Sequence, residues 1–180
     1  MDAKVEKTLQ KLEETGREFW IIPHETGEFL NNLIREKNIK CVLEVGTSIG
    51  YSGIWMAEAL SHTGGKLYTL ESHNERFAKA KNHFEEAGLT KYVTQLKGHA
   101  PDIEIPDMFD LLFLDATKIE YVSYIKTFLF HMKKGGIIIA DNAISHRKEL
   151  AEYEKYIFNS DQLKSELKEL GAGIFISTII

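Results

Sequence analysis

Short apolar runs alternate with amphipathic stretches along most of the chain. The runs that predict strands are residues 41–45, 66–71, 92–98, 109–115 and 135–142, and the run before Asp115 is typical of a strand buried on both faces. The stretches between them carry apolar side chains at helical spacing; in residues 74–88, for example, Phe77, Ala80 and Phe84 share one face. This alternation predicts a parallel sheet with helices on both faces.

The last part of the chain breaks this rhythm. After a helix expected at about residues 145–158, two strand-like segments, LKSELKEL and IFISTII, are separated only by a glycine–alanine–glycine turn at residues 171–173. So short a turn predicts an antiparallel hairpin at one end of the sheet. Helices are also expected at residues 2–17 and 118–132. We therefore predict an α/β fold whose mostly parallel sheet has seven strands.

Composition narrows the class of protein. The chain has 180 residues, of which 43% are hydrophobic and 27% charged, which is typical of a globular protein. No linker or repeat interrupts it, so we expect one domain over residues 1–180, with residues 1–19 as a helical extension. The net charge of −5, without a basic block, disfavours a dedicated nucleic-acid binder. With a single cysteine and no run of about 20 apolar residues, we expect a cytoplasmic protein without a membrane span.

The first predicted strand leads into the stretch LEVGTSIGYS. Gly46 and Gly50 would allow a tight turn and a close backbone approach to a ligand, and Ser52 could donate a hydrogen bond at the start of the next helix. Two glycines after a strand are also compatible with a simple turn. Glu71 ends the second strand, where an acid can accept hydrogen bonds from a ribose diol. A glycine turn and an acid so placed together favour a nucleoside-binding site.

Oxygen-bearing side chains follow the fourth and fifth predicted strands. Asp115 ends one of these strands, and Asp141 and Asn142 end the other. Neighbouring parallel strands would bring the three side chains to one edge of the sheet, where they would suit Mg²⁺. As an alternative, the two aspartates cap the helices that follow them. Lys118, three residues after Asp115, is either a catalytic group or a solvated lysine in the first turn of a helix.

The stretch E-V-G-T-S-I-G-Y-S and the acid at the end of the second strand resemble those of class I S-adenosylmethionine-dependent methyltransferases. The resemblance implies a Rossmann-like methyltransferase fold in which the glycine loop wraps the methionine part of the cofactor and the acid binds its ribose. It also implies an adenine contact near residue 100 and a closing segment near residues 20–22. The cofactor-binding residues that it implies are Trp20, Ile22, Glu44, Gly46, Ser52, Glu71, Ala100 and Asp115.

The patterns D-A-T-K-x-x-Y and G-G-x-I-x-x-D-N are similar to those of the metal-dependent O-methyltransferases, which include catechol and caffeoyl-coenzyme A O-methyltransferases. This resemblance implies that Asp115, Asp141 and Asn142 bind a divalent metal, with Mg²⁺ favoured over Mn²⁺ or Ca²⁺. It implies that Lys118 is the general base and that the acceptor is a catechol-like or other vicinal-oxygen small molecule. It also implies a homodimer.

Two departures from the family pattern bear on the site, the first on a contact to the cofactor or around the metal and the second on the acceptor. Thr117 stands where the family usually has Asp or a bulkier residue. After D-N the chain reads AISHRKEL, so His146 and Arg147 replace the apolar, tryptophan-containing loop that is common in the family. His146 is either a contact to the acceptor or an exposed residue at a helix start. A tRNA nucleoside hydroxyl is the alternative acceptor, and a non-enzymatic cofactor-binding protein is the third hypothesis.

Overall fold

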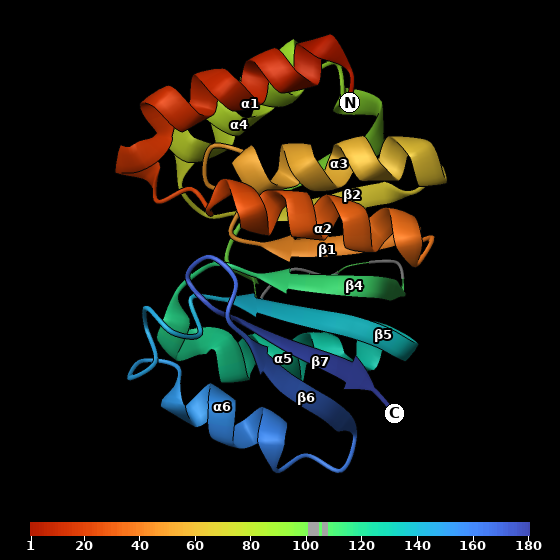
Figure 1. Cartoon of the computed structure of the whole chain (residues 1–180), viewed down its shortest axis with the longest axis vertical. Helices are drawn as coiled ribbons and strands as arrows, with labels where there is room; N and C mark the ends of the chain where they lie inside the picture. Colours follow the sequence, from red (N-terminus) through yellow and green to blue (C-terminus); the bar gives the residue numbers. More distant parts are fainter. Residues whose placement is uncertain (101–104, 106–107) are drawn as a thin grey trace.

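The computed structural model describes residues 1–100, 105 and 108–180, apart from the side chain of Arg17. Within this part of the chain the strands form one seven-stranded sheet in the order β3-β2-β1-β4-β5-β7-β6 (Figure 1). The strands are β1 (Cys41–Val45), β2 (Lys66–Glu71), β3 (Val93–Lys97), β4 (Phe109–Leu114), β5 (Met132–Asp141), β6 (Leu163–Lys168) and β7 (Ile174–Ile179).

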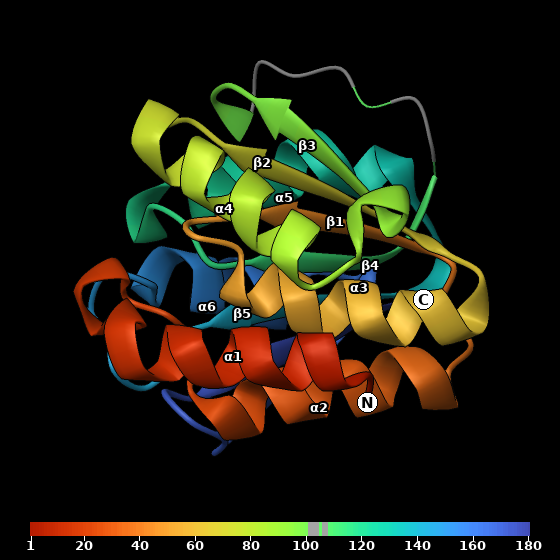
Figure 2. The same ribbon diagram turned by 90° about the horizontal axis from the view of Figure 1, so that it is seen from above.

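Helices cover both faces of the sheet (Figures 1 and 2). One face carries α1 (Ala3–Thr15), α2 (His24–Glu36), α3 (Tyr51–Thr63) and α4 (Asn74–Glu86), and the other carries α5 (Tyr121–Phe128) and α6 (Ala151–Phe158). Short 3₁₀ turns lie at Gly16–Phe19, Thr90–Tyr92, Lys118–Glu120 and Leu129–His131. None of the helices in the described ranges has the length and apolar character needed to cross a membrane.

The central strands are apolar without interruption because each of their faces is covered. In β4, Leu111 and Phe113 belong to the core beneath α1–α4, whereas Leu112 and Leu114 belong to the core beneath α5 and α6. All four side chains are fully buried. Burial on both faces explains why the run in the sequence shows no polar alternation.

The order of the strands creates a site for a ligand. The sheet grows from β1 outward to β2 and β3, and the chain then returns to β4 on the other side of β1, with all of these strands parallel. The switch between β1 and β4 opens a crevice at the carboxyl ends of the strands, where ligands bind in such sheets. The predicted hairpin is confirmed, because β7 pairs antiparallel with both β5 and β6.

The helix predicted at residues 118–132 is wrong in its extent. Only Tyr121–Phe128 is α-helical, and Met132 begins β5, where it pairs with Phe109 of β4. The apolar spacing of residues 128–132 resembles a helix, but pairing with the sheet decides its conformation. The register between β4 and β5 then shifts after Phe109, so that the next pair is Leu111 with Ile137.

The helix predicted at residues 145–158 is also too long, because α6 begins at Ala151. The preceding backbone pairs with the loop that joins β6 to β7. The Ala143 N–H donates to the Gly173 carbonyl at 2.8 Å, and the Ile144 N–H donates to the Ala172 carbonyl at 3.0 Å. These bonds hold residues 143–145 in turns instead of a first helical turn.

Candidate active site

A cavity of about 590 Å³ lies at the carboxyl ends of β1, β2, β4 and β5. Two groups of predicted residues meet there. The residues predicted to bind the cofactor contribute Gly46, Glu71 and Ala100. The residues predicted to bind the metal or act as the base contribute Asp115, Lys118, Asp141 and Asn142. This volume is in the range of small-molecule sites. The fold therefore brings both predicted ends of the site into one cavity.

Gly46 is required by the approach of a neighbouring strand. Its φ is +104°, and a Cβ atom there would lie 2.1 Å from the backbone oxygen of Asp115. The Asp115 N–H in turn donates to the Val45 carbonyl at 3.0 Å. The glycine therefore lets the end of β4 pack against the end of β1, which places Asp115 beside the glycine turn (residues 46–50).

Glu71 is 5% exposed and its carboxylate is held from several sides. Oε2 accepts the Ser48 N–H at 2.8 Å, and Oε1 accepts the His73 N–H at 2.7 Å. The Arg76 guanidinium lies 3.5 Å from Oε1. The backbone around the cavity therefore orients this acid before any ligand arrives, as a ribose-binding carboxylate requires.

Glu44 and Ser52 lie beneath the glycine turn and not among the residues that line the cavity. The Ser52 hydroxyl donates to Glu44, and the Thr69 hydroxyl donates to the same carboxylate at 2.6 Å. Burial raises the pKa of Glu44 to about 7, although both hydrogen bonds oppose the rise. This buried network supports the floor of the glycine turn, and a direct contact of either residue with the cofactor stays a prediction.

The segment between α1 and α2 crosses the mouth of the cavity. Trp20 and Ile22 both line it, but they differ in exposure: Trp20 is 80% exposed and Ile22 is 4% exposed. Trp20 also has a left-handed backbone, with φ of +50°. On the far side, Ala100 is buried and lines the cavity near His99. In the predicted closing segment, the Ile22 side chain is therefore buried, whereas the Trp20 ring is exposed to solvent.

Asp115 and Lys118 form an ion pair at the chemical end. The Lys118 Nζ lies 2.8 Å from Oδ1 of Asp115, and both side chains are about 15% exposed. Nζ also lies 5.4 Å from the centre of the Tyr121 ring. Burial raises the pKa of Asp115, and the lysine opposes that rise. Lys118 sits in a 3₁₀ turn and not in the first turn of an α-helix.

Asp141 is 1% exposed, and its Oδ1 has no hydrogen-bond partner within the described residues. Burial, followed by the negative charge of Asp115, raises its pKa to about 7. Asn142 has φ of +69°, and its amide nitrogen donates to the Ser145 hydroxyl at 3.3 Å. That bond uses the NH₂ group and not the amide oxygen. Neither aspartate is the N-terminal cap of a helix, which removes the alternative reading.

These residues fit a divalent cation. Two carboxylates that repel each other and a buried oxygen without a partner are stabilised by a nearby cation. Asp115, Asp141 and Asn142 offer hard oxygen donors. Within the described ranges no group of three or more His, Cys, Asp or Glu could hold a metal, so the predicted set depends on the amide of Asn142. A bound metal stays a prediction.

The two basic residues after Asn142 separate in the structure. His146 lines the cavity, and its Nδ1 lies 3.0 Å from the Ser145 hydroxyl. Arg147 instead reaches Glu154 of α6 at 3.2 Å and is not among the lining residues. Of these two basic residues, only His146 therefore lies in the wall of the cavity.

Sequence reasoning missed Ser48 and Arg76, which line the cavity, and Thr69, which donates to Glu44 beneath the glycine turn. Thr69 is fully buried on β2, and its hydroxyl also lies 2.5 Å from that of Thr47. Arg76 lines the cavity from the first turn of α4. A buried threonine two residues before an acid gives a weak signal at best, and Ser48 gives none, because its contacts are with residues 19 and 71.

The strand order, the C-terminal hairpin and a cavity at the carboxyl ends of the strands define the Rossmann-like methyltransferase class. Within that class, a family model described as O-methyltransferase matches residues 2–170. The chain therefore belongs to the O-methyltransferase family.

Known proteins support this membership. Catechol O-methyltransferase from Niastella koreensis is 38% identical over 148 residues, which cover 78% of this chain and 66% of that protein. Caffeoyl-CoA O-methyltransferase 2 from Eucalyptus globulus is 32% identical over 126 residues, which cover 66% of this chain and 51% of that protein. The chain thus spans about two thirds and about half of these relatives' lengths.

The fold is also that of a solved O-methyltransferase. The structure of the O-methyltransferase from Bacillus cereus in complex with SAH superimposes with a TM-score of 0.86 and 24% identity. The match covers 100% of this chain and 92% of that one. At this level of identity the likeness establishes the fold.

Proposed function

We propose that the protein transfers a methyl group from S-adenosylmethionine to a hydroxyl of a small acceptor with two adjacent oxygens, such as a catechol. The observation that carries the proposal is that one cavity is lined both by the oriented acid Glu71 and by Lys118, Asp115 and Asp141, whose Oδ1 has no partner among the described residues. The family membership and the names of the catechol and caffeoyl-CoA relatives support the same reaction.

The residues at the cofactor end of the cavity bind and orient S-adenosylmethionine. Glu71 accepts hydrogen bonds from the ribose hydroxyls, and Ala100 lies against the adenine. Gly46 lets Asp115 pack beside the glycine turn, along which the methionine part of the cofactor lies. S-adenosylmethionine supplies an electrophilic methyl group on its sulfonium. Binding holds that methyl group and the acceptor oxygen at reacting distance. This lowers the activation barrier, chiefly because binding has already removed the translational and rotational freedom of the two reactants.

The acceptor end prepares the nucleophile. Asp115, Asp141 and Asn142 would hold a divalent cation, with Mg²⁺ favoured over Mn²⁺ or Ca²⁺, and the cation would supply Lewis acidity that lowers the pKa of the acceptor hydroxyl. Lys118, whose Nζ lies 2.8 Å from Oδ1 of Asp115, would accept the proton of the acceptor hydroxyl at Nζ as the neutral amine, once Asp115 binds the cation in place of the ammonium. His146 lines the cavity near enough to Asp115 to act on its charge, and there it contacts the acceptor.

Methyl transfer to a panel of catechols tests the proposal. The purified protein is assayed with S-adenosylmethionine in the presence of Mg²⁺ or EDTA, beside Lys118→Ala and Asp141→Ala. We expect metal-dependent turnover that falls at least about 100-fold in both variants. The matched control is Lys126→Ala, on the exposed side of α5, which should leave turnover unchanged.

Two results would contradict the proposal in different ways. Full turnover in EDTA would remove the metal from the mechanism. Cofactor binding without methylation of any catechol, together with methylation of tRNA, would replace the small acceptor by a nucleoside hydroxyl. We also propose a homodimer on the basis of the resemblance, and light scattering of the purified protein after size exclusion tests it.

A further inference from the structure

Ser48 makes two contacts that join separate parts of the cavity. Its backbone N–H donates to Oε2 of Glu71 at 2.8 Å, and its hydroxyl donates to the carbonyl of Phe19 at 3.1 Å. Glu71 is the acid at the end of β2, and Phe19 begins the crossing segment (residues 19–23) at the mouth of the cavity. Ser48 therefore contacts both the acid at the end of β2 and the segment at the mouth of the cavity.

The backbone of Ser48 is held in an uncommon conformation. Its φ is +48°, in the left-handed region that residues other than glycine, asparagine and aspartate rarely adopt. A serine gains nothing from this conformation in a turn where glycine would be easier, unless its side chain is used. The hydroxyl contact with Phe19 is the use that the structure shows.

The crossing segment is fixed at its ends and exposed in its middle. The Phe19 ring lies 4.3 Å from Nζ of Lys79, and Ile22 is buried. Trp20 between them is 80% exposed although it lines the cavity. The only side-chain hydrogen bond found between the glycine turn and this segment, within the described residues, comes from Ser48.

We propose that Ser48 is a positioning residue that couples the acid Glu71 to the crossing segment, so that cofactor bound at Glu71 draws Trp20 over the cavity. The inference rests on the proposed role of Glu71 in binding the ribose. A cofactor on Glu71 fixes the Ser48 N–H, and the hydroxyl of the same residue transmits that restraint to the Phe19 carbonyl. Trp20, the next residue, then loses its solvent exposure.

Titration with S-adenosylhomocysteine tests the coupling without acceptor or metal. The chain has two tryptophans, and Trp55 is only 4% exposed, so Trp20→Phe separates the fluorescence change of Trp20 from that of Trp55. The variants are Ser48→Ala and Ser48→Gly. Both lack the hydroxyl and keep the N–H, but glycine adopts the left-handed backbone freely and alanine does not. Ser61→Ala, at the far end of α3, is the matched control.

We expect both Ser48 variants to bind S-adenosylhomocysteine about five- to tenfold more weakly, the equivalent of one hydrogen bond, and to lose the Trp20 signal at saturation. Binding by Ser48→Gly that equals the wild type in affinity and in the Trp20 signal overturns the proposal. Weaker binding by the alanine variant alone also overturns it, since backbone strain would then be the cause.

The same titration separates this inference from the proposed function. Glu71→Gln should weaken S-adenosylhomocysteine binding whether or not Ser48 is a positioning residue. A Glu71→Gln variant that binds like the wild type contradicts the assignment of Glu71 to the ribose. A wild type that binds S-adenosylhomocysteine but methylates no catechol contradicts the proposed acceptor and leaves the Ser48 result standing. Thermal unfolding of each variant verifies that the protein measured is folded.

Discussion

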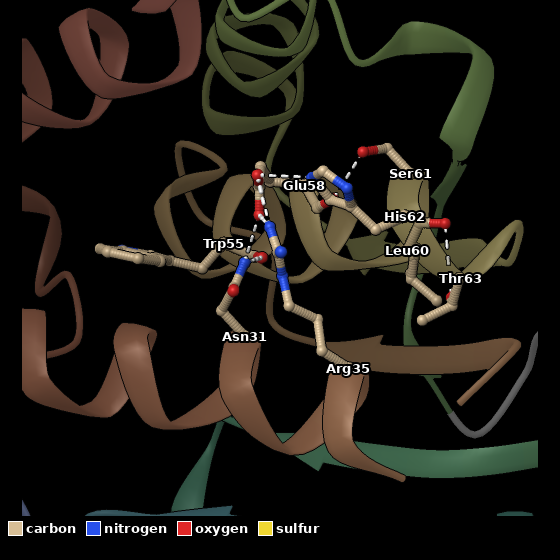
Figure 3. Close-up of polar contacts among 8 residues, drawn as sticks. All are labelled: Asn31, Arg35, Trp55, Glu58, Leu60, Ser61, His62 and Thr63. Atoms are coloured by element: carbon tan, nitrogen blue, oxygen red, sulfur yellow. Dashed lines mark hydrogen bonds and ion pairs between the residues drawn. The ribbon is translucent and has the colours of Figure 1, made fainter. Parts of the chain in front are cut away.

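Glu58 of α3 holds α2 against α3 through a buried carboxylate (Figure 3). Its side chain is 2% exposed. The Arg35 guanidinium donates to both of its oxygens at 2.7 Å, and the Asn31 amide donates at 2.6 Å. The His62 ring lies 3.0 Å from Oε1. The perturbation with the clearest outcome is Glu58→Gln, which keeps the shape and removes the charge.

The loss of stability depends on how deeply each partner of the ion pair is buried. Removing one partner of a buried ion pair costs about 3–5 kcal/mol, whereas exposed pairs are worth about 0–1 kcal/mol. Glu58 is buried but the Arg35 side chain is 37% exposed, so solvent screens part of the attraction. We therefore expect Glu58→Gln to lower the free energy of unfolding by about 2 kcal/mol near neutral pH.

The sign of the pH dependence follows from the pKa. Burial alone would raise the pKa of Glu58, but the hydrogen bonds from Arg35, Asn31 and His62 outweigh it and hold the pKa below its ordinary value of 4.5. A lowered pKa in the folded state means that the charge stabilises the protein above the unfolded-state pKa. That stabilisation is lost as the pH falls through the folded-state pKa. The difference between wild type and Glu58→Gln should therefore shrink below pH 4.5.

Urea unfolding of both proteins at about pH 7, 5 and 4 measures this difference. The control is Glu86→Gln, which breaks the pair with Lys11; Glu86 is 46% exposed, so its loss should cost no more than about 0.5 kcal/mol. A loss at neutral pH no larger than the control's would refute the reasoning. So would a loss of the same size at every pH, because the charge would then not be its cause.

Three further outcomes are expected. Gly46→Ala should lower the midpoint of thermal unfolding and abolish S-adenosylhomocysteine binding in calorimetry, because its Cβ would lie 2.1 Å from the Asp115 backbone oxygen; unchanged binding would contradict this packing. Asp141→Asn should raise the thermal midpoint in EDTA, because it removes a buried charge beside Asp115, and should abolish any rise on adding Mg²⁺. His146→Gln should raise the KM for the acceptor several-fold with kcat within about twofold, since uniform binding affects KM alone; steady-state kinetics would show the reverse if this residue took part in the chemistry.

Much of the fold could be predicted because it depends on local pattern. The apolar runs of the central strands β1 and β4 are strands since they are buried on both faces, and the short glycine-rich turn at residues 171–173 favours a hairpin. The ends of two elements could not be predicted. Residue Met132 pairs with Phe109, and the backbone of residues 143–145 pairs with the β6–β7 loop. Both pairings join segments that local periodicity does not relate.

The candidate site divides in the same way. The polar residues that end the strands could be found from the sequence, because parallel strands present their carboxyl ends at one edge. Their environments could not be found. The structure alone places Glu44 beneath the glycine turn, turns Arg147 away to Glu154, and leaves one oxygen of Asp141 without a partner in the described part of the chain.

The sequence by itself therefore determined which segments are strands, how the strands follow one another along the chain, and which polar side chains stand at their ends. These properties depend on side chains close together along the chain. Only the tertiary structure decided that Gly46 must be a glycine, because the backbone that crowds it belongs to Asp115, the residue that follows β4. It alone also showed that Ser48 joins Glu71 to Phe19. Such contacts depend on how strands and helices distant in the sequence pack, and no local pattern encodes them.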